Sequence, residues 1–173
     1  MESMGLFDKL TGTKRPAPGV APGSPEEVRA ALLGLNGPDV PYVVRDGAAD
    51  DADLVAEWRM AEPAWQTFFV ESQLTRAVRI RMRLVQEDHE VRALEEQWEV
   101  TRVGNPPRLV ASSEYSRGPD RTVSRHWTIG RGRSGRLEAT ETFRFDAAEL
   151  RNPLRNAVVE SGWTWRGLIF GKL

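Results

Sequence analysis

Few residues in this chain of 173 have the side-chain chemistry of a metal site or a catalytic centre. There is no cysteine and there are only two histidines, His89 and His126, so a zinc ion would take most of its ligands from carboxylates. Asp88 and Glu90 flank His89, but three consecutive side chains in a loop rarely converge on one ion. The phosphate-binding glycine loop, the dinucleotide fingerprint, the nucleophile elbow and the zinc-protease motif do not occur. The sequence therefore predicts no metal and no cofactor, and it favours a non-enzymatic protein over an enzyme of unfamiliar design.

One pair of opposite charges is distinguished from the other polar residues by its position. The segments RTVSRHWTI (121–129) and RLEATETFRF (136–145) are typical of a β-hairpin, and pairing Ile129 with Leu137 keeps their apolar residues on one face. The same register places Arg125 opposite Glu141 on that face, where unlike charges must pair because desolvation is costly. We expect an internal ion pair there, or a polar group that binds a ligand if the face borders an open groove. The candidate groove residues are Arg125, Glu141, Trp127 and Trp98.

Arginine supplies nearly all of the positive charge, because only three of the 24 basic residues are lysine. In AVRIRMRL (77–84) three arginines alternate with apolar residues, and the following segment supplies Glu95, Glu96 and Glu99. Opposite charges on neighbouring strands form cross-strand pairs, each contributing only tenths of a kcal/mol when solvated. We therefore interpret these arginines as one side of a solvated ladder and not as an anion site.

A second arginine cluster, GRGRSGR (130–136), has the charge to bind phosphates. RNA-binding modules add exposed aromatic side chains on which bases stack, and no aromatic residue is interleaved here. The formal charge of −1 and the isoelectric point near 6.2 also exclude a surface that is basic throughout. We expect no nucleic-acid partner.

The N-terminal segment MGLFDKL places Leu6, Phe7 and Leu10 within one helical turn and a half. These three residues are candidates for membrane contact, which would be weak because a single short apolar cluster rarely anchors a protein. The following residues, LTGTKRPAPGVAPGS (10–24), are rich in proline and glycine and predict a flexible linker. We expect a tail over residues 1–23 and one domain over residues 24–173.

Two helices are marked by their capping residues. SPEEVRAALLGLNG (24–37) begins with Ser24 as N-cap, Pro25 at the first helical position and Glu27 completing a capping box. DAAELRNPLRNAVVESG (146–162) has an apolar stripe at i, i+4 and i+8 and a glycine stop at Gly162. A third, shorter helix is predicted in EPAWQTFFVESQL (62–74) from the spacing of its aromatic residues.

Seven short segments have the composition of strands. Two of them, VPYVVRDG (40–47) and ADLVAEWRM (52–60), precede the short helix, and five follow it with short connections, which favours an antiparallel meander. In EVRALEEQWEVTRV (90–103) the alternation changes at Ala93-Leu94, which predicts a β-bulge. The expected fold is α+β, a curved antiparallel sheet of about six to eight strands packed against helices that include a C-terminal helix. The alternative is an orthogonal sandwich like that of pleckstrin-homology domains.

The last residues, GWTWRGLIFGKL (162–173), are apolar where chain ends are usually polar. Trp163 and Trp165 alternate with polar residues, as in a strand, and a free tail of this kind would be an aggregation hazard. We therefore predict that the segment turns back at Gly162 and packs both tryptophans against the domain.

Several segments together resemble a group of uncharacterised proteins of high-GC Gram-positive bacteria. The resemblance rests on MGLFDKLTGT, PYVVRDG, DLVAEW, HEVRA and GWTWRG, and it covers most of the chain. It implies an actinobacterial origin, which also explains the preference for arginine over lysine, and it implies no activity.

Taken together, these features predict a cytoplasmic binding or adaptor module with an apolar groove between sheet and helices. Its expected partner is a protein or a small apolar ligand. The alternatives are an enzyme with an unrecognised site in that groove and a peripheral membrane protein that uses Leu6, Phe7 and Leu10. The sequence has no uncharged apolar run of 18 residues, so it predicts no transmembrane helix.

Overall fold

The computed structural model describes residues 5–71, 76–117, 126–131, 137–144, 147–168 and 173, with the backbone alone for Phe7 and for residues between 111 and 144. The helices in this part of the chain are α1 (Leu6–Thr11), α2 (Pro25–Leu33), α3 (Pro63–Glu71) and α4 (Ala147–Glu160), with 3₁₀ turns η1 (Ala48–Asp50) and η2 (Gln86–Asp88). The strands are β1 (Tyr42–Asp46), β2 (Leu54–Trp58), β3 (Arg76–Val85), β4 (Glu90–Val103), β5 (Arg108–Arg117), β6 (His126–Arg131), β7 (Leu137–Arg144) and β8 (Thr164–Leu168).

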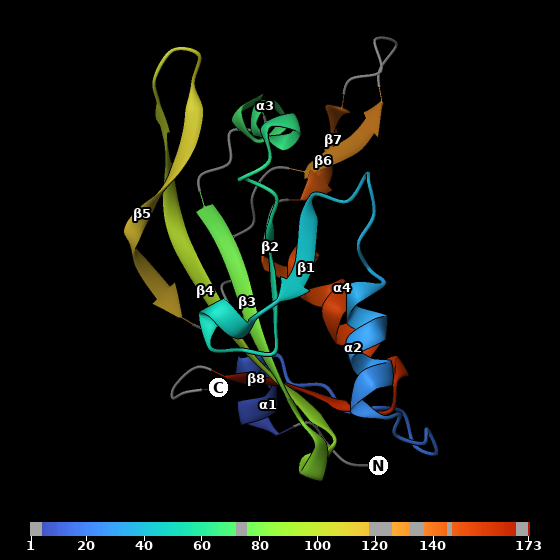
Figure 1. Cartoon of the computed structure of the whole chain (residues 1–173). Helices are drawn as coiled ribbons and strands as arrows, with labels where there is room; N and C mark the ends of the chain where they lie inside the picture. Colours follow the sequence, from blue (N-terminus) through green and yellow to red (C-terminus); the bar gives the residue numbers. More distant parts are fainter. Residues whose placement is uncertain (1–4, 72–75, 118–125, 132–136, 145–146, 169–172) are drawn as a thin grey trace.

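A curled six-stranded sheet forms the centre of the molecule (Figure 1). Strands β1 to β5 follow one another as an antiparallel meander, and β8 joins the far edge of β4 in parallel, beside Glu90 to Leu94. Strand β5 occupies the rest of that edge of β4, from Glu96 to Val103. The fold is therefore α+β with a curved, mainly antiparallel sheet and a C-terminal helix packed against it, as the sequence predicted.

The predicted run of five meander strands is divided in the structure. Strands β3, β4 and β5 belong to the large sheet, whereas β6 and β7 pair with each other in a separate two-stranded sheet. The predicted register of this second hairpin is wrong by two residues, since Ile129 lies opposite Ala139 and Arg131 lies opposite Leu137. A shift of two keeps the same residues on each face, so the apolar alternation could not distinguish the two registers.

The predicted β-bulge at Ala93-Leu94 is also wrong in position. The pairing of β3 with β4 continues without interruption across both residues, and the irregularity lies between Trp98 and Val100, in the pairing with β5. Ala93 and Leu94 are both buried because β4 is covered on both faces at this point, so its sequence alternates less than that of a half-buried strand.

Helix α2 begins as its sequence predicts. The Ser24 side chain accepts a hydrogen bond from the Glu27 amide at 3.1 Å, and the Glu27 carboxylate accepts one from the Ser24 amide at 2.7 Å, which completes the capping box. The helix ends at Leu33, before the predicted Asn36-Gly37 stop, and Asn36 instead exchanges two hydrogen bonds with the backbone of Val44. This exchange attaches the end of α2 to β1.

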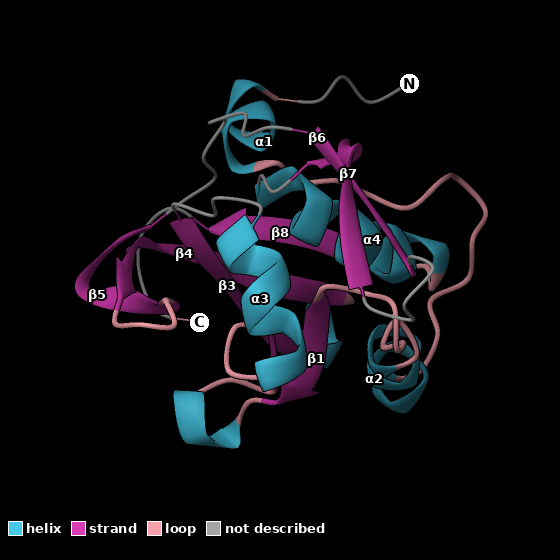
Figure 2. Ribbon diagram, turned by 90° about the horizontal axis from the view of Figure 1, so that it is seen from above, coloured by secondary structure: helices cyan, strands magenta, loops and turns pink. Residues whose placement is uncertain are grey.

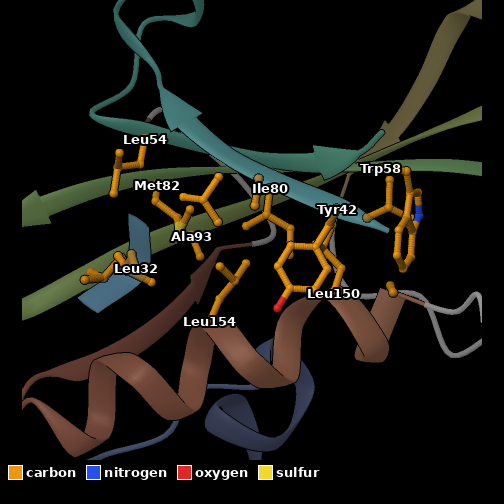
Figure 3. Packing of buried hydrophobic residues seen from close by; sticks show 14 of the residues in the cluster. Leu32, Tyr42, Leu54, Trp58, Ile80, Met82, Ala93, Leu150 and Leu154 are labelled. Carbon is orange, nitrogen blue, oxygen red and sulfur yellow. The ribbon is translucent and has the colours of Figure 1, made fainter. Parts of the chain in front are cut away.

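The core lies between the concave face of the sheet and helices α2 and α4 (Figure 3). Leu150 and Leu154 point from α4 toward Ile80 and Met82 of β3, and all four are fully buried. The helix continues through Pro153 to Glu160. Helix α3, the predicted short helix, closes one end of the core with three mutually contacting aromatic rings, those of Trp65, Phe68 and Phe69. Such aromatic clusters stabilise a core beyond the area they bury.

The C-terminal tryptophans are part of the folded domain. Gly162 ends α4 with a φ of 79°, the chain turns back as β8, and Trp163 and Trp165 are 0% and 1% exposed. Each indole ring removes roughly 150–250 Å² from water. The prediction that this segment doubles back and packs both rings against the domain is therefore confirmed.

The segment between α1 and α2, for which the sequence predicted a flexible linker, makes specific contacts with the C-terminal part of the chain. Lys14 exchanges two backbone hydrogen bonds with Trp165 of β8, at 2.8 and 2.9 Å, and the Trp163 indole donates to the Gly23 carbonyl at 2.8 Å. Figures 1 and 2 show the result, in which α1 lies against β8. Residues far apart in sequence supply these contacts, so the local composition contained no signal for them.

Candidate functional site

One of the four predicted groove residues, Trp98, lines a groove in the described part of the protein. Arg125 lies outside the described residues, and Trp127 and Glu141 are placed only as backbone positions on β6 and β7. The register on which the Arg125–Glu141 pair was predicted is not the one found. The structure therefore does not bring these four residues together as a described site.

The groove at Trp98 is created where β2 ends. Strand β2 pairs with β3 only as far as Glu57 opposite Arg79, and the chain then leaves the sheet toward α3 while β3 extends to Arg76. The resulting cavity has a volume of about 260 Å³. Its lining residues are Glu57, Trp58, Met60, Ala61, Ala77, Val78, Arg79 and Trp98. Most of them are apolar, and Met60, Ala61, Ala77 and Trp98 are at least partly exposed to solvent.

The two charged side chains of this groove are already paired within the protein. Arg79 contacts Asp50 at 3.0 Å and Glu96 at 3.3 Å, and its guanidinium lies 4.8 Å from the centre of the Trp98 ring. Glu57 accepts a hydrogen bond from Arg45 at 2.9 Å, which is the main reason that the pKa of Arg45 lies above its ordinary value. The groove therefore offers apolar surface with mutually neutralised charges along one side.

The arginine ladder beside the groove is more buried than the sequence suggested. Arg79 and Arg81 both contact Glu96, whose side chain is only 2% exposed, and Arg83 contacts Asp51. Arg81 also donates a hydrogen bond to the Asp50 carbonyl of η1, which covers this face. The prediction of a solvated ladder is therefore wrong for Arg79 and Arg81, which share the buried Glu96, whereas the pair of Arg83 with Asp51 is exposed to solvent.

An internal ion pair exists, but with partners that the sequence analysis did not select. Glu95 lies on the concave face of β4 opposite Ile80, is 4% exposed, and accepts two hydrogen bonds from Arg151 of α4. Strict alternation from Val91 and Ala93 places Glu95 on the core face. The predicted bulge at Ala93-Leu94 reverses the faces of the residues that follow it, so the sequence did not indicate Glu95 as a core residue. The pair joins the sheet to α4 through the middle of the core.

Two polar atoms remain near this ion pair without partners among the described residues. They are Nε2 of Gln97, which follows Glu95 on the same face of β4, and Nε of Arg155, one turn after Arg151. The pKa of Arg155 lies below its ordinary value, mainly because the side chain is buried and to a smaller extent because Arg151 repels its charge.

A second, shallower depression is lined by charged residues beside β8. Glu90 is 4% exposed and contacts Arg166 at 2.6 Å and Arg92 at 2.7 Å, and Arg92 also reaches Asp88 at 3.3 Å. Burial alone raises the pKa of the Glu90 carboxyl, but the hydrogen bonds from both arginines outweigh it and hold that pKa below its ordinary value. Two cations and two anions balance here, which is the pattern of a structural ion-pair network that fixes β8 to β4.

The candidate membrane-contact residues lie on α1. Leu6 is 77% exposed and Leu10 is 54% exposed, while the side chain of Phe7 is not described. Within the described residues no group of three histidine, cysteine or acidic side chains could hold a metal ion. None of the described helices is long and apolar enough to cross a membrane.

Comparison with known proteins supplies no further assignment. The chain matches no protein-family model, no curated protein and no solved structure. The resemblance to actinobacterial proteins stays a prediction.

Proposed function

We propose that this protein is a small, non-enzymatic binding module that receives an apolar side chain of a protein partner in the groove at the end of β2. The observation that carries the proposal is the lining of this groove, in which Met60, Ala61 and Trp98 present apolar surface to solvent. Apolar surface that is both concave and exposed is the usual mark of a contact site.

The size of the groove favours a side chain over a cofactor. Ligand and cofactor pockets usually enclose about 300–1,000 Å³, and this one encloses about 260 Å³. An aromatic or branched aliphatic side chain fits a pocket of this size, and such anchors dominate the free energy of many protein interfaces.

The electrostatics of the groove favour an uncharged group. The carboxylate of Glu57 and the guanidinium of Arg79 are engaged by Arg45, Asp50 and Glu96. A charged ligand would have to displace one of these pairs and would strand the remaining charge. An apolar group leaves all of them intact while it covers the Trp98 ring and the Met60 side chain.

The proposal is tested by NMR on protein labelled with ¹³C at the methionine methyl groups. Met60 lines the groove, and Met82, which is 0% exposed in the core, provides an internal control. We expect N-acetyl-tryptophanamide, a model of a tryptophan side chain in a peptide, to shift the Met60 methyl resonance saturably and to leave Met82 unchanged.

Two matched variants locate the binding. Ala61→Arg places a long side chain in the groove, whereas Ala64→Arg changes an exposed alanine of α3 that does not line it. Ala61→Arg should abolish the Met60 response and Ala64→Arg should preserve it. Absence of any Met60 shift at millimolar probe, or equal binding by both variants, would overturn the proposal. Binding of free indole but not of the capped amide would assign the groove to a small ligand instead.

A further inference from the structure

Helix α1 buries two polar side chains, Asp8 and Thr11, and exposes two leucines, Leu6 and Leu10. Asp8 and Thr11 are 8% and 1% exposed, whereas Leu6 and Leu10 are 77% and 54% exposed. Leu6 and Leu10 are four residues apart and so lie on the same side of the helix. A helix on the surface of a globular protein normally has the opposite arrangement. The outward face of α1 therefore has the composition of a surface that something else covers.

The structure holds this apolar face in a fixed position. The carboxylate of Asp8 forms a salt bridge with Arg15 at 2.7 Å, and its backbone carbonyl accepts a hydrogen bond from the Thr13 amide at 3.0 Å. The Thr13 hydroxyl in turn accepts a hydrogen bond from the Gly167 amide of β8 at 3.1 Å. The two backbone hydrogen bonds between Lys14 and Trp165 continue this attachment. The exposed leucines thus project from an anchored helix and not from a loose chain end.

The exposed charges of α1 and of the residues directly after it are basic. Lys9, Lys14 and Arg15 are exposed, and the only acidic residue between positions 5 and 20, Asp8, is buried and paired with Arg15. Lys9 is three residues after Leu6 and shares its side of the helix. Among the described residues every salt bridge uses arginine, and neither Lys9 nor Lys14 takes part in one.

We propose that the outward face of α1 is a contact site for an anionic membrane surface. Leucines that enter the headgroup region flanked by solvated lysines are the pattern of an interfacial helix, because the lysines reach the lipid phosphates while the leucines leave water. A second copy of this chain fits less well, since a two-fold contact would bring the basic residues of both helices together. Contact through one short helix is reversible and depends on ionic strength.

The test is co-sedimentation of the full chain with vesicles of phosphatidylcholine alone and with about a quarter phosphatidylglycerol. We expect binding to the anionic vesicles only, with the partition coefficient falling as salt rises from about 50 to about 300 mM because screening weakens the attraction. Leu6→Ser with Leu10→Ser should lower the partition coefficient at least about tenfold. Lys9→Gln with Lys14→Gln should lower it and flatten its salt dependence.

A matched control changes exposed apolar residues elsewhere. Val103 and Val110 lie in the hairpin of β4 and β5 and are 45% and 41% exposed, and Val103→Ser with Val110→Ser should bind like the unchanged protein. Thermal unfolding of each variant verifies that the fold is kept. Equal binding to neutral and anionic vesicles, no binding at low salt, or equal loss in the control would overturn the proposal. A concentration-dependent dimer in analytical ultracentrifugation that the Leu6 and Leu10 changes abolish would assign the face to a second copy.

Discussion

At the scale of single residues, Glu95 is a carboxylate held inside the hydrophobic core by Arg151 of α4. A buried charge is tolerated only while it is paired, and removing one partner leaves the other desolvated and uncompensated. The pair therefore makes the packing of α4 on the sheet depend on two specific side chains.

Glu95→Ala should lower the free energy of unfolding by about 3–5 kcal/mol, because Arg151 is then stranded. Glu99→Ala is the matched control, since Glu99 is an exposed residue of the same strand, and it should change little. Urea denaturation measures both. The double replacement Glu95→Met with Arg151→Met should recover much of the loss. Equal stability of the Glu95 and Glu99 variants would contradict the role assigned to this pair.

The ionised side chain of Glu90 should make the free energy of unfolding depend on pH in the acidic range. The pKa of Glu90 is lowered in the folded protein, so the unfolded chain binds its proton more readily. Its contribution is therefore present above the unfolded value, about 4.3, and is lost as pH falls through the folded value.

Glu90→Gln should be less stable than the unchanged protein at pH 7, and the difference should shrink as the pH falls from about 5 to about 3. Denaturant unfolding at several pH values gives the comparison. Glu87→Gln, an exposed neighbour, should show no such trend. A stability difference for Glu90→Gln that does not depend on pH would contradict the ionic account.

At the scale of elements, the contact between α1 and β8 is the least expected part of the fold. Gly167 makes it possible, because a Cβ atom at this position would lie 1.8 Å from the carbonyl oxygen of Thr11. The backbones of the two terminal segments therefore approach more closely than any side chain at position 167 would permit.

Gly167→Ala should separate the two segments and lower stability by about 1–3 kcal/mol or more, as overpacking does elsewhere. Gly5→Ala is the matched control, since its added Cβ would lie 4.0 Å from the nearest atom, the Oδ2 of Asp8. Differential scanning calorimetry distinguishes them. If both variants unfold at the temperature of the unchanged protein, the close approach at Gly167 is not what holds α1 in place.

Elements with strong local signals could be predicted from the sequence. Ser24, Pro25 and Glu27 determine the start of α2, and the alternation of AVRIRMRL predicts the buried face of β3. The register of β6 and β7 could not be predicted, because a shift of two residues preserves the apolar face. The contacts of residues 13–23 with Trp163 and β8 depend on partners more than a hundred residues away, so local composition indicated a linker.

At the scale of the whole molecule, the candidate site could be predicted only in part. The sequence predicted an apolar groove between the sheet and the helices, with Trp98 as one of its four candidate residues, whereas the described groove is formed where β2 ends short of β3, beside Arg79 and Trp98. The lengths of neighbouring strands create it, and those lengths are a property of the assembled sheet. Met60 and Ala61 were not selected, because neither has a distinctive residue type or spacing.

The whole molecule presents two separate contact surfaces, the groove at Met60 and the outward face of α1. They are built from different segments and can be tested one at a time. The first carries the proposed function, and it depends directly on the fold because the end of β2 produces it.

The most direct test of this central claim is a set of isotope-filtered nuclear Overhauser effects between bound N-acetyl-tryptophanamide and the labelled protein. The account predicts contacts from the indole protons of the probe to the Met60 methyl group, to Ala61 and to the ring of Trp98, all of which line the groove. Contacts confined to other surfaces, such as Leu6 and Leu10, or no contacts with Met60 in a saturated complex, would contradict it.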